Sequence, residues 1–391
     1  MLKKYLYRYC LVAACIGLLA GCKQGNRNVE ESSSRITERV DLVPDMELVA
    51  DPVLNDAARF VGGLPVRNPN SKLFALTQTK EWKNHAKNMN QIWNSYQQNL
   101  PKVLAFTQNE LADINERCDF LYYPFGGPDF LFANVFFPDM DSYFLIGLEK
   151  AGTPIQVNHP SKATYRLYQE AVSDILNLSF FSTQGLETRL SNDTIDGVLP
   201  IISLIMARTD KEIISIENRI LTEKGEITAT NADGSPIIHN TGFVEIRYFR
   251  SGSRRLQTLY YLETDLSNTG LNGHKGLLAL MKRFDIARTA TFIKSASYLM
   301  HEESFSVIRK AVLDHSSVIL QDDSSVPYPF FTRDKWNITL YGTFYKPVSA
   351  YSKYTQTELR DAYQLGEPKP LNFRVGFARQ SNLLIARRKG L

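Results

Sequence analysis

The chain has 391 residues, 43% hydrophobic and 22% charged, a balance typical of a folded globular protein with room for one or two domains. The formal net charge is +4, but three of the 45 basic residues and none of the 41 acidic ones lie within residues 1–21. The remaining chain is therefore close to neutral. Its charge does not indicate a nucleic-acid partner.

Residues 1–21 have the plan of a secretory signal peptide. Lys3, Lys4 and Arg8 precede an uncharged run from Cys10 to Leu19, and small residues follow it. A helix of this length, about ten residues, rises about 15 Å, which is too little to span a hydrocarbon core of roughly 30 Å. We therefore expect a cleaved signal and no permanent membrane span at this end.

The sequence Leu19-Ala20-Gly21-Cys22 resembles the lipobox of bacterial lipoproteins. This resemblance implies cleavage before Cys22 and lipid attachment to its thiol, with the membrane as a partner through the acyl chains. Lys23 follows, where an Asp favours inner-membrane retention in enteric bacteria, so we expect the outer membrane. Each buried CH₂ of the acyl chains contributes about 0.8 kcal/mol to such an anchor.

Cysteine content limits the covalent chemistry of the mature chain. Cys10 and Cys15 lie in the expected signal and Cys22 is the expected lipid site, so Cys118 alone remains. One thiol can form neither an internal disulfide nor a cysteine-based zinc cluster.

Residues 22–50 are expected to be the lipidated cysteine and a flexible tether, because the segment is polar, contains "EESSS" and has no aromatic residue. Residues 51–391 are expected to form a globular body, either one large domain or two intimately packed halves. Its first stretch, residues 51–69, is rich in turn-forming residues, and we expect it to dock on the surface.

Hydrophobic periodicity predicts a helix over 82–96 and a second one after Pro101. Three aromatic-rich runs then predict strands, separated by Gly-Gly-Pro-Asp and Pro-Asp-Met-Asp turns, and an antiparallel meander is the natural interpretation. The runs are 119–123, 130–137 and 142–148. None alternates cleanly, which indicates a sheet covered on both faces.

Later segments mix helices with antiparallel hairpins. The expected helices are 163–178, 197–207, 277–283, 291–300 and 305–315. The expected strands are 244–248 and 256–266, which form a hairpin, and 318–320, 337–345 and 371–377; the intervening "GLNGHKG" is expected to be a flexible loop. This mixture predicts the α+β class, an antiparallel sheet of hairpins and a meander with packed helices, rather than a doubly wound sheet.

Two acidic loops are the candidate ligand or active-site loops. In the first, Gly126 and Gly127 allow a ligand to approach the backbone closely, and Asp129 is a candidate base or cation ligand. The alternative is a rigid turn in which Asp129 caps local amides. In the second, Asp322 and Asp323 follow a strand, where paired carboxylates bind hard cations or divide acid and base roles. The alternative there is a solvated turn, since adjacent extended residues point to opposite sides.

Standard catalytic motifs are absent from the sequence, including G-x-S-x-G, H-E-x-x-H and the P-loop. The histidines are scattered without metal-ligand spacing, and we expect neither a metal site nor a cofactor. Besides His85, which lies in the helix expected over 82–96, they are His159, His239, His274, His301 and His315.

The mature body resembles uncharacterised envelope lipoproteins around "YYPFGGPDFLFANVFFP" and "ILQDDSSVPYPFF". We expect a lipid-anchored binding or assembly component of the cell envelope, with an envelope protein or glycan as partner and no enzymatic activity. The alternative is an anchored hydrolase that uses Asp129, Asp322 or Asp323 with a nearby histidine.

Overall fold

The structure is a computed structural model that describes residues 48–157, 160–178, 191–192, 195–376 and 382–391. The expected signal peptide, Cys22 and nearly all of the expected tether lie outside these residues. Within them, no helix has both the length and the apolar character needed to cross a bilayer.

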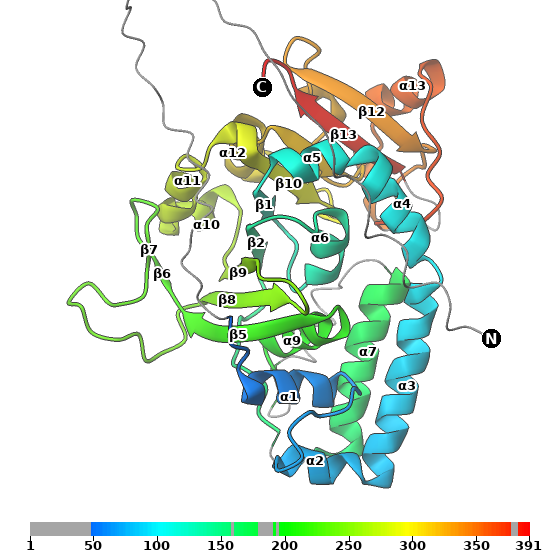
Figure 1. The fold of residues 1–391 in the computed structure, drawn as a ribbon. Helices are drawn as coiled ribbons and strands as arrows, with labels where there is room; N and C mark the ends of the chain where they lie inside the picture. The colour runs from blue at the N-terminus through cyan, green and yellow to red at the C-terminus, as the bar shows by residue number, and fades with distance from the viewer. Residues whose placement is uncertain (1–47, 158–159, 179–190, 193–194, 377–381) are drawn as a thin grey trace, which may run out of the picture. The chain divides into compact units, whose positions relative to one another are not determined.

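A nine-stranded sheet is the centre of the described body (Figure 1). Its strands are β1 (Phe120–Tyr123), β2 (Ser142–Gly147), β5 (Lys211–Asn218), β8 (Phe243–Arg250), β9 (Leu256–Glu263), β10 (Thr289–Ile293), β11 (Val318–Gln321), β12 (Trp336–Gly342) and β13 (Asn382–Arg388). They lie in the order β12-β13-β11-β10-β1-β2-β9-β8-β5. The five strands from β11 to β9 are parallel, and two antiparallel strands extend the sheet on each side. Two small ribbons, β3 (Ser191–Asn192) with β4 (Ile195–Asp196) and β6 (Ile220–Leu221) with β7 (Ile227–Thr228), stand apart.

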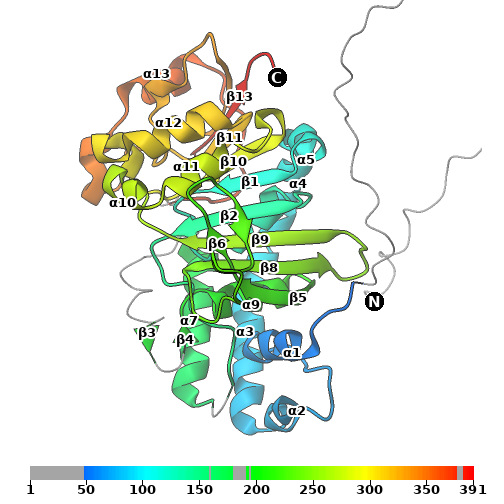
Figure 2. The ribbon, with the colours of Figure 1, turned by 90° about the vertical axis from the view of Figure 1, so that its left-hand side faces the viewer.

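Helices cover both faces of the sheet. They are α1 (Pro52–Val61), α2 (Lys72–Thr77), α3 (Lys80–Gln97), α4 (Leu100–Glu110), α5 (Ala112–Arg117), α6 (Phe130–Phe136), α7 (Lys162–Leu178), α9 (Leu199–Arg208), α10 (Asn268–Gly273), α11 (Lys275–Met281), α12 (Ser306–His315) and α13 (Thr357–Leu365). Short 3₁₀ turns are η1 (Ile286–Arg288), η2 (Leu299–His301), η3 (Glu303–Phe305), η4 (Tyr328–Phe330) and η5 (Ser349–Tyr354). Figure 1 shows α10, α11 and α12 on one side of the sheet and α4 and α6 on the other. Helices α3 and α7 pack side by side, as Figure 2 also shows.

Strand β1 shows why the two faces are both apolar. Its side chains alternate, so that Leu121 and Tyr123 enter one core cluster while Phe120 and Tyr122 enter the other. Parallel strands that are buried on both faces lose the polar alternation of a one-sided sheet. The expected two-sided burial is therefore confirmed.

The α+β class is confirmed, and so are most of the predicted elements. Helices α3, α4, α7, α9, α11 and α12, the β8–β9 hairpin, and strands β1, β2, β11 and β12 lie within a few residues of the expected ranges. The aromatic stripe of α3 packs in the core, with Trp82, Trp93 and Tyr96 all buried. The centre of the sheet differs from the expectation because it is parallel.

The predicted meander is wrong because its middle strand is helix α6. Asp129 caps this helix by accepting a hydrogen bond from the Phe132 amide at 3.2 Å. All seven residues of α6 are buried, so neither the helical nor the strand period was visible in the sequence. With α6 as the crossover, β1 and β2 pair in parallel.

Four further expectations are wrong. The predicted helix 291–300 begins as β10, and "GLNGHKG" is largely helical in α10 and α11. Residues 371–376 form no strand, and Phe377 lies outside the described residues. The turn-rich start contains α1, whose Phe60 and Val61 are buried; Asp51 caps this helix and Pro52 occupies its first turn.

Candidate functional site

The order of the parallel strands reverses beside β1. From β1 the chain proceeds to β2 and then β9 on one side, and it returns to form β10 and β11 on the other. Numbered along the chain, these strands lie 3-2-1-4-5, the order of a doubly wound sheet. Ligands of such sheets bind outside the carboxyl ends of the strands at the reversal. Here that position lies between β1 and β10.

A cleft of about 80 Å³ occupies this position. Gly126 and Gly127 reach it from the end of β1, Glu149 from the end of β2, and Lys294 and Ser295 from the end of β10. The first of the two acidic loops therefore lies at the reversal of strand order.

Asp129 and Lys294 form a buried ion pair at the base of this cleft. Lys294 Nζ lies 2.8 Å from Asp129 Oδ2, and the two side chains are only 3% and 2% exposed. The Tyr123 hydroxyl donates to the same carboxylate oxygen at 2.7 Å, and the ammonium lies 4.7 Å from the centre of the Phe132 ring. Asp129 thus caps α6, as the alternative interpretation proposed, and also neutralises a lysine.

Glu149 is, with Lys294 and Ser295, a site residue that the sequence did not predict. It is 6% exposed, and its carboxylate lies so close to Gly147 that a Cβ there would overlap it. A Cβ on Gly127 would stand 3.1 Å from Glu149 Oε2. The Tyr261 hydroxyl donates to the Glu149 carbonyl at 2.6 Å and fixes the backbone. The sequence did contain a pattern that could have indicated Glu149. It is an acidic residue directly after a strand and about 20 residues beyond a glycine pair.

Asp322 and Asp323 are not in a solvated turn. Asp322 is 3% exposed and accepts hydrogen bonds from the Ser295 amide at 2.8 Å and the Ser324 hydroxyl at 2.6 Å. Asp323 accepts from the Tyr298 hydroxyl at 2.6 Å. Burial raises the pKa of both carboxyl groups, and burial together with the Asp322 charge raises the pKa of Asp323 to about 6.

The two acidic loops converge on the segment that follows β10. Lys294 contacts Asp129 of the first loop, and the next residue, Ser295, donates to Asp322 of the second. Ser295, Ser297 and Tyr298 have left-handed backbones, with φ of 53°, 53° and 59°. Such residues cost on the order of 1–3 kcal/mol each and cluster at functional sites. The buried Ser295 hydroxyl, which lines the cleft, has no hydrogen-bond partner in the described part of the chain.

His301 lies next to this segment, with its ring 5.2 Å from that of Tyr298. Burial lowers the pKa of His301 to about 4, and among the described residues its Nε2 has no hydrogen-bond partner. His159 lies outside the described residues. Within them, no group of three or more His, Cys, Asp or Glu side chains is arranged to hold a metal ion.

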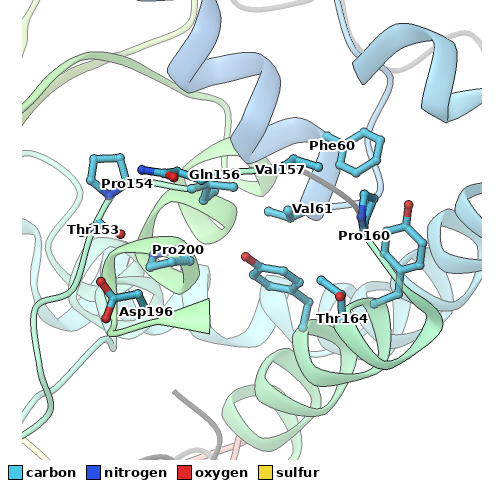
Figure 3. A pocket seen from close by; sticks show the side chains of 13 residues that line it. Phe60, Val61, Thr153, Pro154, Gln156, Val157, Pro160, Thr164, Asp196 and Pro200 are labelled. Atoms are coloured by element: carbon cyan, nitrogen blue, oxygen red, sulfur yellow. The ribbon is translucent and has the colours of Figure 1, made fainter. Parts of the chain in front are cut away.

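A second cavity of about 240 Å³ lies between α1, α7 and the segment after β2 (Figure 3). Asp196 is the one charged side chain among the described residues that line it, and this carboxylate pairs with Lys150 at 2.7 Å. The remaining lining is apolar or neutral, including Phe60 and Pro200. The strand-end cleft is smaller but brings together more reactive groups, so we assign the candidate site there.

Comparison with known proteins adds no assignment to this site. No model of a protein family matches the chain, and no curated protein matches it as a relative. The chemistry of the site is therefore argued from its geometry.

Proposed function

We propose that the strand-end cleft binds a nucleoside that carries no phosphate group. The observation that supports this most directly is the position of the Glu149 carboxylate against Gly127 and Gly147, beside the reversal of strand order. In dinucleotide-binding sheets, an acidic residue about 20 positions after the glycine-rich turn accepts the ribose hydroxyls. Glu149 follows the Gly126-Gly127 pair by about that interval.

Phosphate groups fit this cleft poorly. A phosphate at a doubly wound sheet normally binds the free amides of the helix that follows the first strand. Here the Asp129 carboxylate occupies that end of α6, and α6 has only seven residues. Among the described residues that line the cleft, the carboxylates of Asp129 and Glu149 stand against one cation, Lys294. This balance favours a neutral or cationic ligand.

The seven strands from β9 to β12, without the β8–β5 extension on the other side, support one such ligand. Strand β13 is antiparallel to β11, and β12 is antiparallel to β13, so the order continues as 3-2-1-4-5-7-6 with the seventh strand reversed. Sheets of this order occur in enzymes that use S-adenosylmethionine, a phosphate-free nucleoside with a cationic sulfonium; this is an analogy of folds. When bound, that cofactor supplies an activated methyl group. Glu149 would hold its ribose, and the Ser295 hydroxyl is available as a second polar contact. The proposal departs from the expectation that no cofactor is needed.

Substitution of Glu149 by Gln is expected to weaken nucleoside binding about tenfold or more, because a charge-assisted hydrogen bond to ribose is lost. Isothermal titration calorimetry would compare S-adenosylmethionine and adenosine with NAD and ATP. The exposed Glu116, changed to Gln, is the matched control and should leave affinity unchanged. Tighter binding of ATP than of adenosine would contradict the proposal. Binding of free sugars alone, lost in Glu149→Gln, would favour a glycan ligand instead.

We propose further that the body is anchored at the cell envelope, with the outer membrane as its location, through lipid on Cys22. The support is the short apolar run followed by Leu19-Ala20-Gly21-Cys22. The anchored body would act as a ligand-binding component. The hydrolase alternative is supported by one contact, the hydrogen bond between the His301 side chain and the Asp323 carbonyl.

Substitution of Cys22 by Ser is expected to move the protein from the membrane fraction to the soluble fraction, because the acylation site is removed. The unprocessed form should accumulate in wild-type cells treated with globomycin, and gel mobility would show it. Cys118→Ser is the control, since its buried thiol lies in the folded body. An unchanged distribution of the Cys22→Ser chain would count against the anchor.

A further inference from the structure

A cavity of about 440 Å³ lies near the amino-terminal ends of the parallel strands, whereas the strand-end cleft proposed for the nucleoside lies at their carboxyl ends. Its polar side is formed where β8 ends and where β5 and β9 begin, which is the amino-terminal edge of the parallel strands. Its other side is formed by α3, α4 and α6. A volume of this size is within the roughly 300–1,000 Å³ of small-molecule sites.

A buried lysine without a carboxylate partner lies in the wall of this cavity. Lys211 is 7% exposed, and its ammonium donates to the Thr209 carbonyl at 3.3 Å. Among the described residues it forms no ion pair, although lysines are almost never fully buried unless paired. Burial lowers the pKa of Lys211 to about 8. Arg208 and Arg250 line the same cavity and add further cations, whereas Arg255 is already paired with Asp141 at 2.6 Å. Two carboxylates, Asp139 and Asp210, also line the cavity and raise the pKa of Lys211, but among the described residues neither forms an ion pair with it.

The opposite wall of the cavity is apolar. Trp93, Leu100, Leu104 and Leu131 line it. Leu104 is 40% exposed, so part of its side chain is open to a ligand. The cavity therefore combines a buried lysine that has no ion pair among the described residues with a mainly apolar wall in which Leu104 is exposed.

We infer that this cavity binds a long-chain carboxylate, with its head group at Lys211 and its alkyl chain along Trp93 and Leu104. A carboxylate would supply the charge partner that the ammonium lacks and would form a charge-assisted hydrogen bond with it. The chain would cover the exposed Leu104 and gain the free energy of burying apolar surface. This inference does not depend on the nucleoside proposal, because the two sites lie at opposite ends of the parallel strands.

The test is calorimetric titration of the Cys22→Ser chain, which avoids detergent, with decanoate, decanol and acetate. Decanoate is expected to bind at one site at least tenfold more tightly than decanol, and acetate is expected not to bind. Lys211→Met should remove that preference for decanoate, while the exposed Lys83→Met should keep it. Glu149→Gln should leave decanoate binding unchanged, which separates this site from the nucleoside cleft.

A second variant tests the inference in case the Lys211→Met protein does not fold. Leu104→Glu changes a partly exposed residue and places a negative charge on the path of the alkyl chain, so it should weaken decanoate at least tenfold. The inference is overturned if decanoate does not bind, if decanol binds equally well, or if both variants retain the wild-type affinity for decanoate.

Discussion

Lys294→Met is expected to destabilise the protein by about 3–5 kcal/mol, because it leaves the Asp129 carboxylate buried without its cation. The two side chains are 3% and 2% exposed and lie 2.8 Å apart, so the carboxylate would lose its charge partner where little water reaches it. The Tyr123 hydroxyl and the Phe132 amide still donate to Asp129, but they carry no charge. Urea unfolding would measure the loss as a lower midpoint with an unchanged slope.

A double-mutant cycle separates the ion pair from general damage to the core. Asp129→Asn alone should also destabilise, and Lys294→Met combined with it should cost about 2–3 kcal/mol less than the sum. The exposed pair Lys310–Asp314 on α12 is the matched control, for which coupling should stay below about 0.5 kcal/mol. Additive losses at Asp129 and Lys294 would show that the pair does not act as a unit.

The candidate loops could be found from the sequence, but their partners could not. Glycines beside Asp129, and paired carboxylates at Asp322 and Asp323, are visible as residue types in a short window. Lys294 contacts Asp129 only because β10 lies beside β1, a pairing of segments about 165 residues apart along the chain. Glu149 belongs to the site for the same reason, since β2 pairs with β1 on its other side.

Errors in the predicted fold have a common physical cause. Helix α6 and strand β10 are both completely buried, so their hydrophobic runs have no polar face from which to identify a period. Whether β1 and β2 pair in parallel or antiparallel depends on the conformation of residues 130–137. A helix in that connection allows a parallel crossover, whereas a strand there would make a meander. Amphipathic elements such as α3 kept their polar faces, and their periodicity was therefore readable.

The proposed anchor and the proposed ligand constrain each other. If the protein is anchored outside the cytoplasm as proposed, it is exposed to extracellular nucleosides and is separated from the cytoplasmic pool of cofactors. Stronger binding of adenosine than of S-adenosylmethionine would therefore agree with an envelope role in ligand capture. Preference for S-adenosylmethionine would favour the catalytic analogy of the sheet and would make the fractionation of the Cys22→Ser chain the deciding measurement.

Gly147→Ala is expected to abolish nucleoside binding and to destabilise the protein by about 1–3 kcal/mol through overpacking. The added Cβ would overlap the Glu149 carboxylate and would stand 2.9 Å from both Gly127 Cα and the Tyr261 hydroxyl. Backbone atoms cannot yield as a flexible side chain can, so Glu149 would be displaced from the cleft. Thermal unfolding and titration with S-adenosylmethionine and adenosine would measure the two effects.

Gly273→Ala is the matched control for Gly147→Ala, because a Cβ at Gly273 meets nothing within 4 Å. It should leave nucleoside affinity unchanged and alter stability by less than about 1 kcal/mol. If Gly147→Ala removes binding while Glu149→Gln does not, the cleft binds the ligand but the carboxylate is not its ribose contact. If Gly147→Ala binds like the wild type, the ligand does not occupy the cleft beside Gly147 and Glu149, and the proposed site is wrong.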